Sequence, residues 1–155
     1  MGLRVKAAIL SSLIGALFGF LTPPALADSL DLSAYKGKVV YLDFWASWCN
    51  PCRLSFPWMN QVQQIYGSKG LVVIAVNVDH DPELAAEFLE ANHAQFKVVY
   101  DPKGQIASKY DFKDMPTSIL IGRDGKVRGE HPGFYTNREA SYVADIDLLL
   151  NEKSQ

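Results

Sequence analysis

Apolar runs alternate with polar breaks along most of the chain, and the runs rich in β-branched and aromatic residues predict strands. The expected strands are Val39 to Phe44, Leu71 to Val78, Lys97 to Asp101, Thr117 to Gly122 and Val127 to His131. The second is almost continuously apolar, which is typical of a central strand covered on both faces. Asp-Gly between the last two strands predicts a tight hairpin.

Helical periodicity appears between these strands. The expected helices begin at the cysteine motif and end at Gly67, begin at Pro82, span 104–110, and begin near Thr136 or Asn137, either of which is a competent N-cap. The order of strand, helix, strand and helix predicts an α/β fold.

The first 27 residues have the features of a secretory signal peptide. Arg4 and Lys6 precede an apolar run of about 15 residues, and Ala25-Leu26-Ala27 follows it. The run is shorter than the roughly 20 residues that span a bilayer, so we expect cleavage after Ala27. The less favoured alternative is an uncleaved anchor. Residues 28–155 then form one domain.

The composition is that of a globular domain, with 48% hydrophobic and 21% charged residues in a chain of 155. Without Arg4 and Lys6, 13 of the 15 Lys and Arg residues remain, against 17 Asp and Glu. No basic cluster is available to neutralise phosphates, so nucleic acid is not an expected partner. We expect a monomer.

The only two cysteines, Cys49 and Cys52, stand three positions apart in Trp-Cys-Asn-Pro-Cys. A structural disulfide across so short a loop would contribute only about 2 kcal/mol. A zinc site would need two further ligands, and His80, His93 and His131 are isolated in the sequence. A thiol–disulfide centre fits better than either, and no metal or cofactor is expected.

A redox centre assigns different roles to the two cysteines. Cys49 falls at the N-terminus of the predicted helix, where free N–H groups and the helix dipole stabilise a thiolate. Cys49 is therefore the expected nucleophile, and Cys52 resolves the mixed disulfide. Asp43, the one acid inside an apolar strand, is a candidate for accepting the proton of Cys52. The alternative is a strand-end aspartate with polar neighbours.

The segment "LDFWASWCNPCR" resembles the active-site segment of thioredoxins, and residues 30 to 150 are similar to the exported TlpA/ResA-like thiol–disulfide oxidoreductases. Further matching motifs are "KGKVV", "VNVD", "MPT" and "DGKV" followed by "HPGF". The resemblance implies membership of the thioredoxin superfamily and a thioredoxin fold, in which a mixed central sheet of four to five strands is flanked by helices on both faces.

By this resemblance, Pro116 is a cis-proline whose loop faces the cysteines and pairs with the substrate backbone, with Met115 and Thr117 on either side. Trp48 would form part of the substrate surface. Gly133 resembles a glycine that lets the substrate approach, although it also suits a simple turn.

Two departures from the family pattern bear on the chemistry. Many relatives carry Asn where this chain has Asp43, which favours proton transfer by Asp43 here. Some relatives place a glutamate near "VNVDHD", where this chain has Asp79, His80 and Asp81. A solvated loop is the favoured interpretation of His80, and His93 and His131 are expected at the surface or at strand ends.

The resemblance implies a periplasmic reductant of protein disulfides, for example those of apocytochrome c or of copper-site assembly proteins. A membrane thiol transporter would supply its electrons. One alternative is a disulfide-forming oxidant of the same fold, because known centres span about −270 to −120 mV. Another is a copper-binding metallochaperone, since thiolates suit Cu(I), although the copper chaperones of this fold use a longer C-x-x-x-C spacing.

Overall fold

The five strands form one mixed sheet in the order β3-β2-β1-β4-β5, and the computed structural model describes residues 30–152. The strands are β1 (Val39–Trp45), β2 (Leu71–Asn77), β3 (Lys97–Tyr100), β4 (Thr117–Ile121) and β5 (Val127–Pro132). The α-helices are α1 (Asn50–Tyr66), α2 (Pro82–Ala91) and α3 (Glu139–Asn151). The 3₁₀ helices are η1 (Leu32–Tyr35), η2 (Gly67–Lys69), η3 (Ala107–Lys109) and η4 (Thr136–Arg138).

The predicted signal peptide lies outside the described residues. Within residues 30–152, no helix is both long and apolar enough to cross a membrane.

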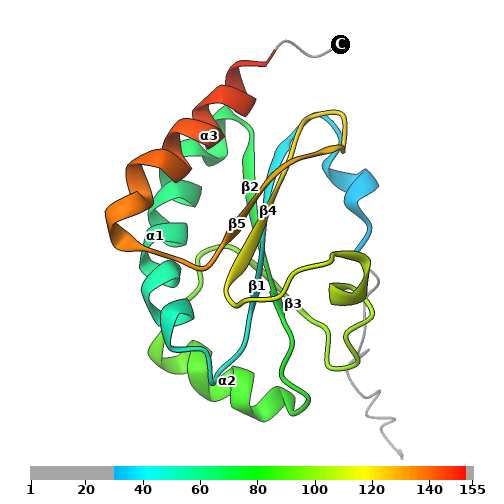
Figure 1. The fold of residues 1–155 in the computed structure, drawn as a ribbon, viewed down its shortest axis with the longest axis vertical. Helices are drawn as coiled ribbons and strands as arrows, with labels where there is room; N and C mark the ends of the chain where they lie inside the picture. The colour runs from blue at the N-terminus through cyan, green and yellow to red at the C-terminus, as the bar shows by residue number, and fades with distance from the viewer. Residues whose placement is uncertain (1–29, 153–155) are drawn as a thin grey trace, which may run out of the picture.

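The connections explain why the α-helices gather on one face of the sheet (Figure 1). β1, β2 and β3 are parallel neighbours, so α1 and α2 connect strands that step across the sheet in the same direction. Right-handed crossovers then place both helices on the same face. β4 and β5 complete the sheet as antiparallel strands, and α3 lies beside α1.

Alternation along β1 divides the hydrophobic residues into two cores. Val39, Tyr41 and Trp45 belong to the core beneath the three α-helices, which also contains Cys49 and Cys52. The intervening side chains of β1 face the second core, which η1, η3 and the segment up to Phe112 cover. The predicted α/β thioredoxin-like fold is confirmed, with the three α-helices on one face and η1 and η3 on the other.

Two predicted helix boundaries are wrong. The helix expected over 104–110 is only the 3₁₀ turn η3, because Tyr110 already has an extended backbone (φ −123°, ψ 126°) and packs its ring on Phe44. The Asp101 carboxylate accepts the backbone N–H groups of Gln105, Ile106 and Ala107 at the start of this turn. The last helix begins at Glu139 rather than near Thr136, and its N-cap residue makes no side-chain capping bond. The turn of η4 precedes it instead.

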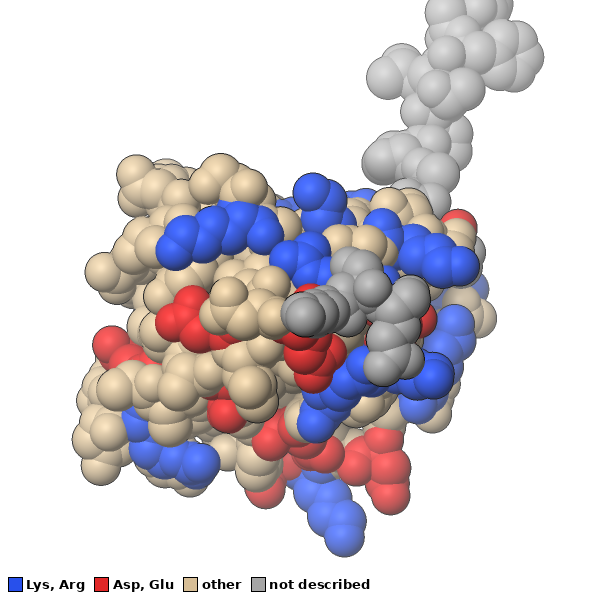
Figure 2. Space-filling model, turned by 90° about the horizontal axis from the view of Figure 1, so that it is seen from above, with Lys and Arg blue, Asp and Glu red and all other residues tan. Residues whose placement is uncertain are grey.

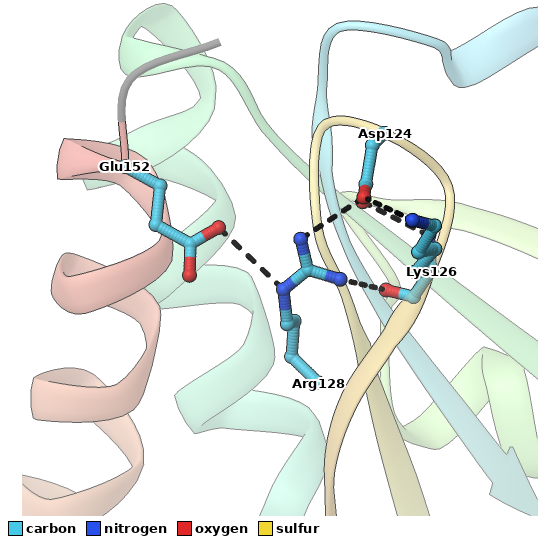
Figure 3. A network of polar contacts seen from close by, with 4 residues as sticks. All are labelled: Asp124, Lys126, Arg128 and Glu152. Carbon is cyan, nitrogen blue, oxygen red and sulfur yellow. Dashed lines mark hydrogen bonds and ion pairs between the residues drawn. The ribbon is translucent and has the colours of Figure 1, made fainter. Parts of the chain in front are cut away.

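At the end of the sheet that carries the β4–β5 hairpin, polar contacts connect the hairpin to neighbouring segments. The Arg128 guanidinium lies 3.1 Å from Asp124 within the hairpin and 3.6 Å from Glu152 beyond α3 (Figure 3). Arg123 donates to the carbonyls of Gly37 and Leu150 at 2.7 and 3.0 Å. Figure 2, which looks onto this end, shows acidic and basic side chains interspersed. Exposed pairs of this kind contribute little individually, so the core carries most of the stability.

The core beneath α3 gives a direct test of this conclusion. Ile146 is fully buried, whereas Leu148 on the same helix is 66% exposed. We expect Ile146→Ala to lower the free energy of unfolding by about 2–5 kcal/mol, through lost burial and a residual cavity. Leu148→Ala is the matched control and should stay within about 0.5 kcal/mol of wild type. Urea denaturation measures both, and equal losses would contradict the assigned packing.

Candidate active site

The two cysteines lie where β1 leads into α1. Cys49 is the N-cap residue of α1, Pro51 occupies the first turn, and Cys52 lies one turn into the helix. The two form a disulfide, and both are buried, at 4% and 0% exposure. The backbone N–H of Cys52 points at the Cys49 sulfur at 3.3 Å. A disulfide in this position can exchange with thiols, because the helix N-terminus favours the Cys49 thiolate.

A buried carboxylate fixes the loop that leads to Cys49. Asp79, just after β2, accepts the backbone N–H of Ser47 at 2.8 Å and its hydroxyl at 2.9 Å. The Asn77 side chain donates to the same carboxylate at 2.7 Å. Three donors compensate the charge of a group that is only 3% exposed. Asp79 therefore connects the end of β2 to the residues immediately before Cys49.

Asp43 is buried in β1, on the face that α1 covers. It is two positions from both Tyr41 and Trp45, so its side chain points to the same face as theirs, and those two residues share their core with both cysteines. The Ser118 hydroxyl donates to Asp43 Oδ1 at 2.7 Å. Burial raises the pKa of Asp43 from 3.8 to about 7, against the lowering effect of the Ser118 bond. Asp43 is therefore buried, as predicted. A carboxyl group with this pKa can exchange protons near neutral pH.

The two loops expected to form the substrate surface are joined to each other. The Met115–Pro116 peptide bond is cis. Gly133 donates its N–H to the Pro116 carbonyl at 2.7 Å, so the segment after β5 lies against the segment before β4. Gly133 has φ of +70°, and a Cβ there would lie 3.0 Å from the Tyr135 ring. Both features favour glycine at this position.

The remaining predicted surface residues differ in exposure. Trp48, next to Cys49 in sequence, is 66% exposed, which leaves it free for the substrate contact expected of it. Met115 is half-buried. Thr117 is fully buried, and its hydroxyl donates to the Asp114 carbonyl at 2.7 Å, so its side chain supports the cis-proline loop from within. Only its backbone can therefore face a substrate.

The three histidines differ in how exposed they are. His80 and His93 are exposed. The His80 ring is hydrogen-bonded to the Pro102 carbonyl. Both observations agree with the solvated loop expected for His80. His131 lies at the end of β5 as expected, but it is buried rather than at the surface, at 8% exposure. Its Nε2 lies 2.9 Å from the Asp145 carboxylate. Its burial follows from the packing of α3 over β5, which sequence spacing does not reveal.

Within residues 30–152, no three His, Cys, Asp or Glu side chains are arranged so that they could hold a metal ion. The fold and the site together define a thioredoxin-like protein with a Cys-x-x-Cys centre at a helix N-terminus.

A family model described as Redoxin matches residues 22–146. The chain therefore belongs to the redoxin family. The thiol-disulfide oxidoreductase ResA of Bacillus thuringiensis subsp. konkukian is 36% identical over 110 residues, which cover 71% of this chain and 64% of that protein. ResA of Bacillus subtilis is 38% identical over 98 residues, covering 63% of this chain and 55% of its own. The chain thus spans less than two thirds of the length of these curated relatives.

Solved structures agree with this assignment. The crystal structure of a putative thiol:disulfide interchange protein DsbE from Chlorobium tepidum shares 51% identity with a TM-score of 0.76. The match covers 77% of this chain and 85% of that one. The predicted similarity to ResA-like members of the thioredoxin superfamily is therefore confirmed.

The raised pKa of Asp43 makes the stability of the oxidised protein depend on pH. Its pKa of about 7 in the folded protein exceeds the 3.8 of a free carboxyl, so the folded state binds this proton more tightly. The stability contributed by this site is complete below pH 4 and is lost as pH rises to about 7. We expect Asp43→Asn to be more stabilising at pH 8 than at pH 4, by a difference on the order of 4 kcal/mol.

Urea denaturation of the disulfide-intact protein at a series of pH values measures this difference. Ser118→Ala is a second variant that keeps the carboxyl group. It removes the bond that lowers the pKa of Asp43, so it should move the loss of stability to higher pH. An effect of Asp43→Asn that does not change with pH would mean that burial does not hold Asp43 neutral.

Proposed function

We propose that the protein is a thiol–disulfide oxidoreductase that reduces disulfides in protein substrates through Cys49 and Cys52. The observation that carries the proposal is the disulfide between these residues at the N-terminus of α1, with Asp43 buried on the face of β1 beneath that helix. The names of the ResA and DsbE relatives agree with this chemistry.

The reaction begins with the reduced protein. The Cys49 thiolate attacks a substrate disulfide, so that a bond forms between Cys49 and one substrate sulfur while the substrate disulfide breaks. The released substrate thiolate takes a proton from solvent. Cys52 then gives its proton to Asp43 and attacks the Cys49 sulfur, and the second substrate thiolate leaves. Two electrons have passed to the substrate, and the Cys49–Cys52 disulfide remains.

The surroundings of Cys49 support reduction over oxidation of substrates. A strongly oxidising centre stabilises its reduced form by stabilising the nucleophilic thiolate. Here the Cys49 sulfur accepts one N–H bond, from Cys52. The nearest basic side chain in sequence, Arg53, is occupied elsewhere, with its guanidinium on the Ser47 carbonyl and over the Phe88 ring. If the reduced centre keeps the contacts of this disulfide form, the thiolate is stabilised only modestly, which corresponds to a reducing couple.

The cellular setting is part of the same proposal. The signal-peptide features of residues 1–27 support export to the periplasm. The TlpA/ResA-like resemblance supports a membrane thiol transporter as the electron donor. It also supports protein disulfides, such as those of apocytochrome c or of copper-site assembly proteins, as substrates. Trp48, Met115, Pro116 and Gly133 form the substrate surface around Cys49 in this proposal, with the backbone of Thr117.

Replacing the cysteines one at a time separates their roles. We expect Cys49→Ser to abolish the reduction of a protein disulfide, because it removes the nucleophile and leaves only Cys52, which is fully buried. Cys52→Ser should accumulate a mixed disulfide with the substrate, because the resolving attack is lost. Thiol trapping and mass spectrometry measure both, and the trapped partner identifies the substrate. Sustained turnover by Cys49→Ser would disprove the assignment.

The reduction potential decides the direction of the reaction. We expect a value close to that of thioredoxin, about −270 mV, when the mature protein is equilibrated in graded thiol–disulfide buffers and its free thiols are counted. A value near −120 mV, as in the oxidant DsbA, would reverse the proposed direction. Titration of the reduced protein with Cu(I) is the control, since tight stoichiometric binding would favour a metallochaperone instead.

A further inference from the structure

A row of polar side chains crosses three strands beneath the α-helices. Asp43 of β1 pairs with Ser118 of β4, and Ser118 pairs with His131 of β5. Residues paired directly across antiparallel strands point to the same face and lie close together. All three are buried, at 1%, 4% and 8% exposure. A polar row of this length inside a hydrophobic core requires a physical explanation.

Both ends of this polar row are incompletely bonded. Among the described residues, Asp43 Oδ2 and His131 Nδ1 are buried without a hydrogen-bond partner. Asp43 Oδ1 is bonded to Ser118, and His131 Nε2 is bonded to Asp145. Because a carboxylate can only accept, Nε2 carries its hydrogen, and Nδ1 is the ring position at which a proton can be gained or lost.

The far end of the row reaches solvent. Asp145 of α3 is about half-exposed, with 51% of its side-chain area accessible. The other groups that face His131 are Tyr41 of β1 and Tyr142 of α3, whose rings lie 6.3 and 4.7 Å from the imidazole. Arg138 lies over the outer Tyr142 ring. Asp145 is thus the charged group bonded directly to the imidazole, and it joins the buried row to the surface.

We propose that His131 is a positioning residue of the redox centre, whose protonation state acts on Asp43 along the row Asp43–Ser118–His131, which Asp145 connects to solvent. A proton at one end of the row disfavours a proton at the other, as expected of interacting groups. When His131 is charged, it stabilises the Asp43 carboxylate, the form that accepts the proton of Cys52. The inference rests on the role of Asp43 in the proposed function.

The test follows the two thiol steps separately. Reduced protein is mixed with limiting 5,5′-dithiobis(2-nitrobenzoate), which releases one chromophore on attack by Cys49 and a second on attack by Cys52. The rate of each phase is measured against pH in stopped flow. The effective dielectric constant at protein sites is about 20. At that value, a unit charge about 10 Å from a titrating group shifts the pKa of that group by about one unit, and we apply this to a charged His131 and Asp43. We therefore expect His131→Gln to move the rising limb of the second phase to higher pH by about one unit, with the first phase unchanged.

Further variants separate this effect from misfolding. Asp145→Asn lies at the surface and should shift the second phase in the same direction, because it removes the charge that favours a protonated imidazole. Asp147→Asn, a charge change on the same helix, is the matched control and should give no shift. In an Asp43→Asn background, His131→Gln should have no further effect on the second phase. An unshifted profile in both His131→Gln and Asp145→Asn would overturn the inference.

A second readout does not require activity. The carboxyl infrared band of Asp43, identified by its loss in Asp43→Asn, is titrated in the oxidised protein with and without His131→Gln. The midpoint should rise in the variant, and an unchanged midpoint would count against coupling. If the midpoint rises but wild type reduces no protein disulfide, the coupling stands and the proposed function fails.

Discussion

The place of β1 in the middle of the sheet is the constraint on which the other features depend. Its backbone is bonded to β2 on one side and to β4 on the other along nearly its whole length. This pairing fixes which side chains of β1 face α1. Asp43 has to lie under the redox helix because Tyr41 and Trp45 do, and the strand must end where Cys49 can begin the helix. The chemistry is therefore set by the register of one strand.

The loop after β1 needs a second point of attachment, and the buried carboxylate of Asp79 provides it. Ser47 is bonded twice to Asp79, and the Val78 N–H donates to the Trp45 carbonyl at 2.9 Å. The loop that presents Trp48 and the nucleophile is thus bonded to the neighbouring strand end as well as to its own. An exposed aromatic side chain can remain well placed under these conditions, because its backbone is fixed on both sides.

The sequence predicted the elements whose signals are local and left out those that depend on tertiary contacts. Periodicity located the five strands, and Gly67 and Pro82 marked the end of α1 and the start of α2. Asp43 was identified because one acid interrupts an apolar run. The packing of Tyr110 on Phe44, which takes the chain out of the helical path after one turn, has no local signal. Ser118 and His131 join the site only through strand register, which a single sequence does not specify.

The separation of the two ends of the sheet has a consequence for how the protein can change. The cysteines, the cis-proline loop and Gly133 lie at the end where β1 finishes and β4 begins, while the β4–β5 hairpin turns at the opposite end (Figure 1). Insertions at the exposed Asp124-Gly125 tip, a kind of position that commonly tolerates them, would extend the molecule away from the two cysteines. Evolution or design could add a recognition module there without rebuilding the redox centre.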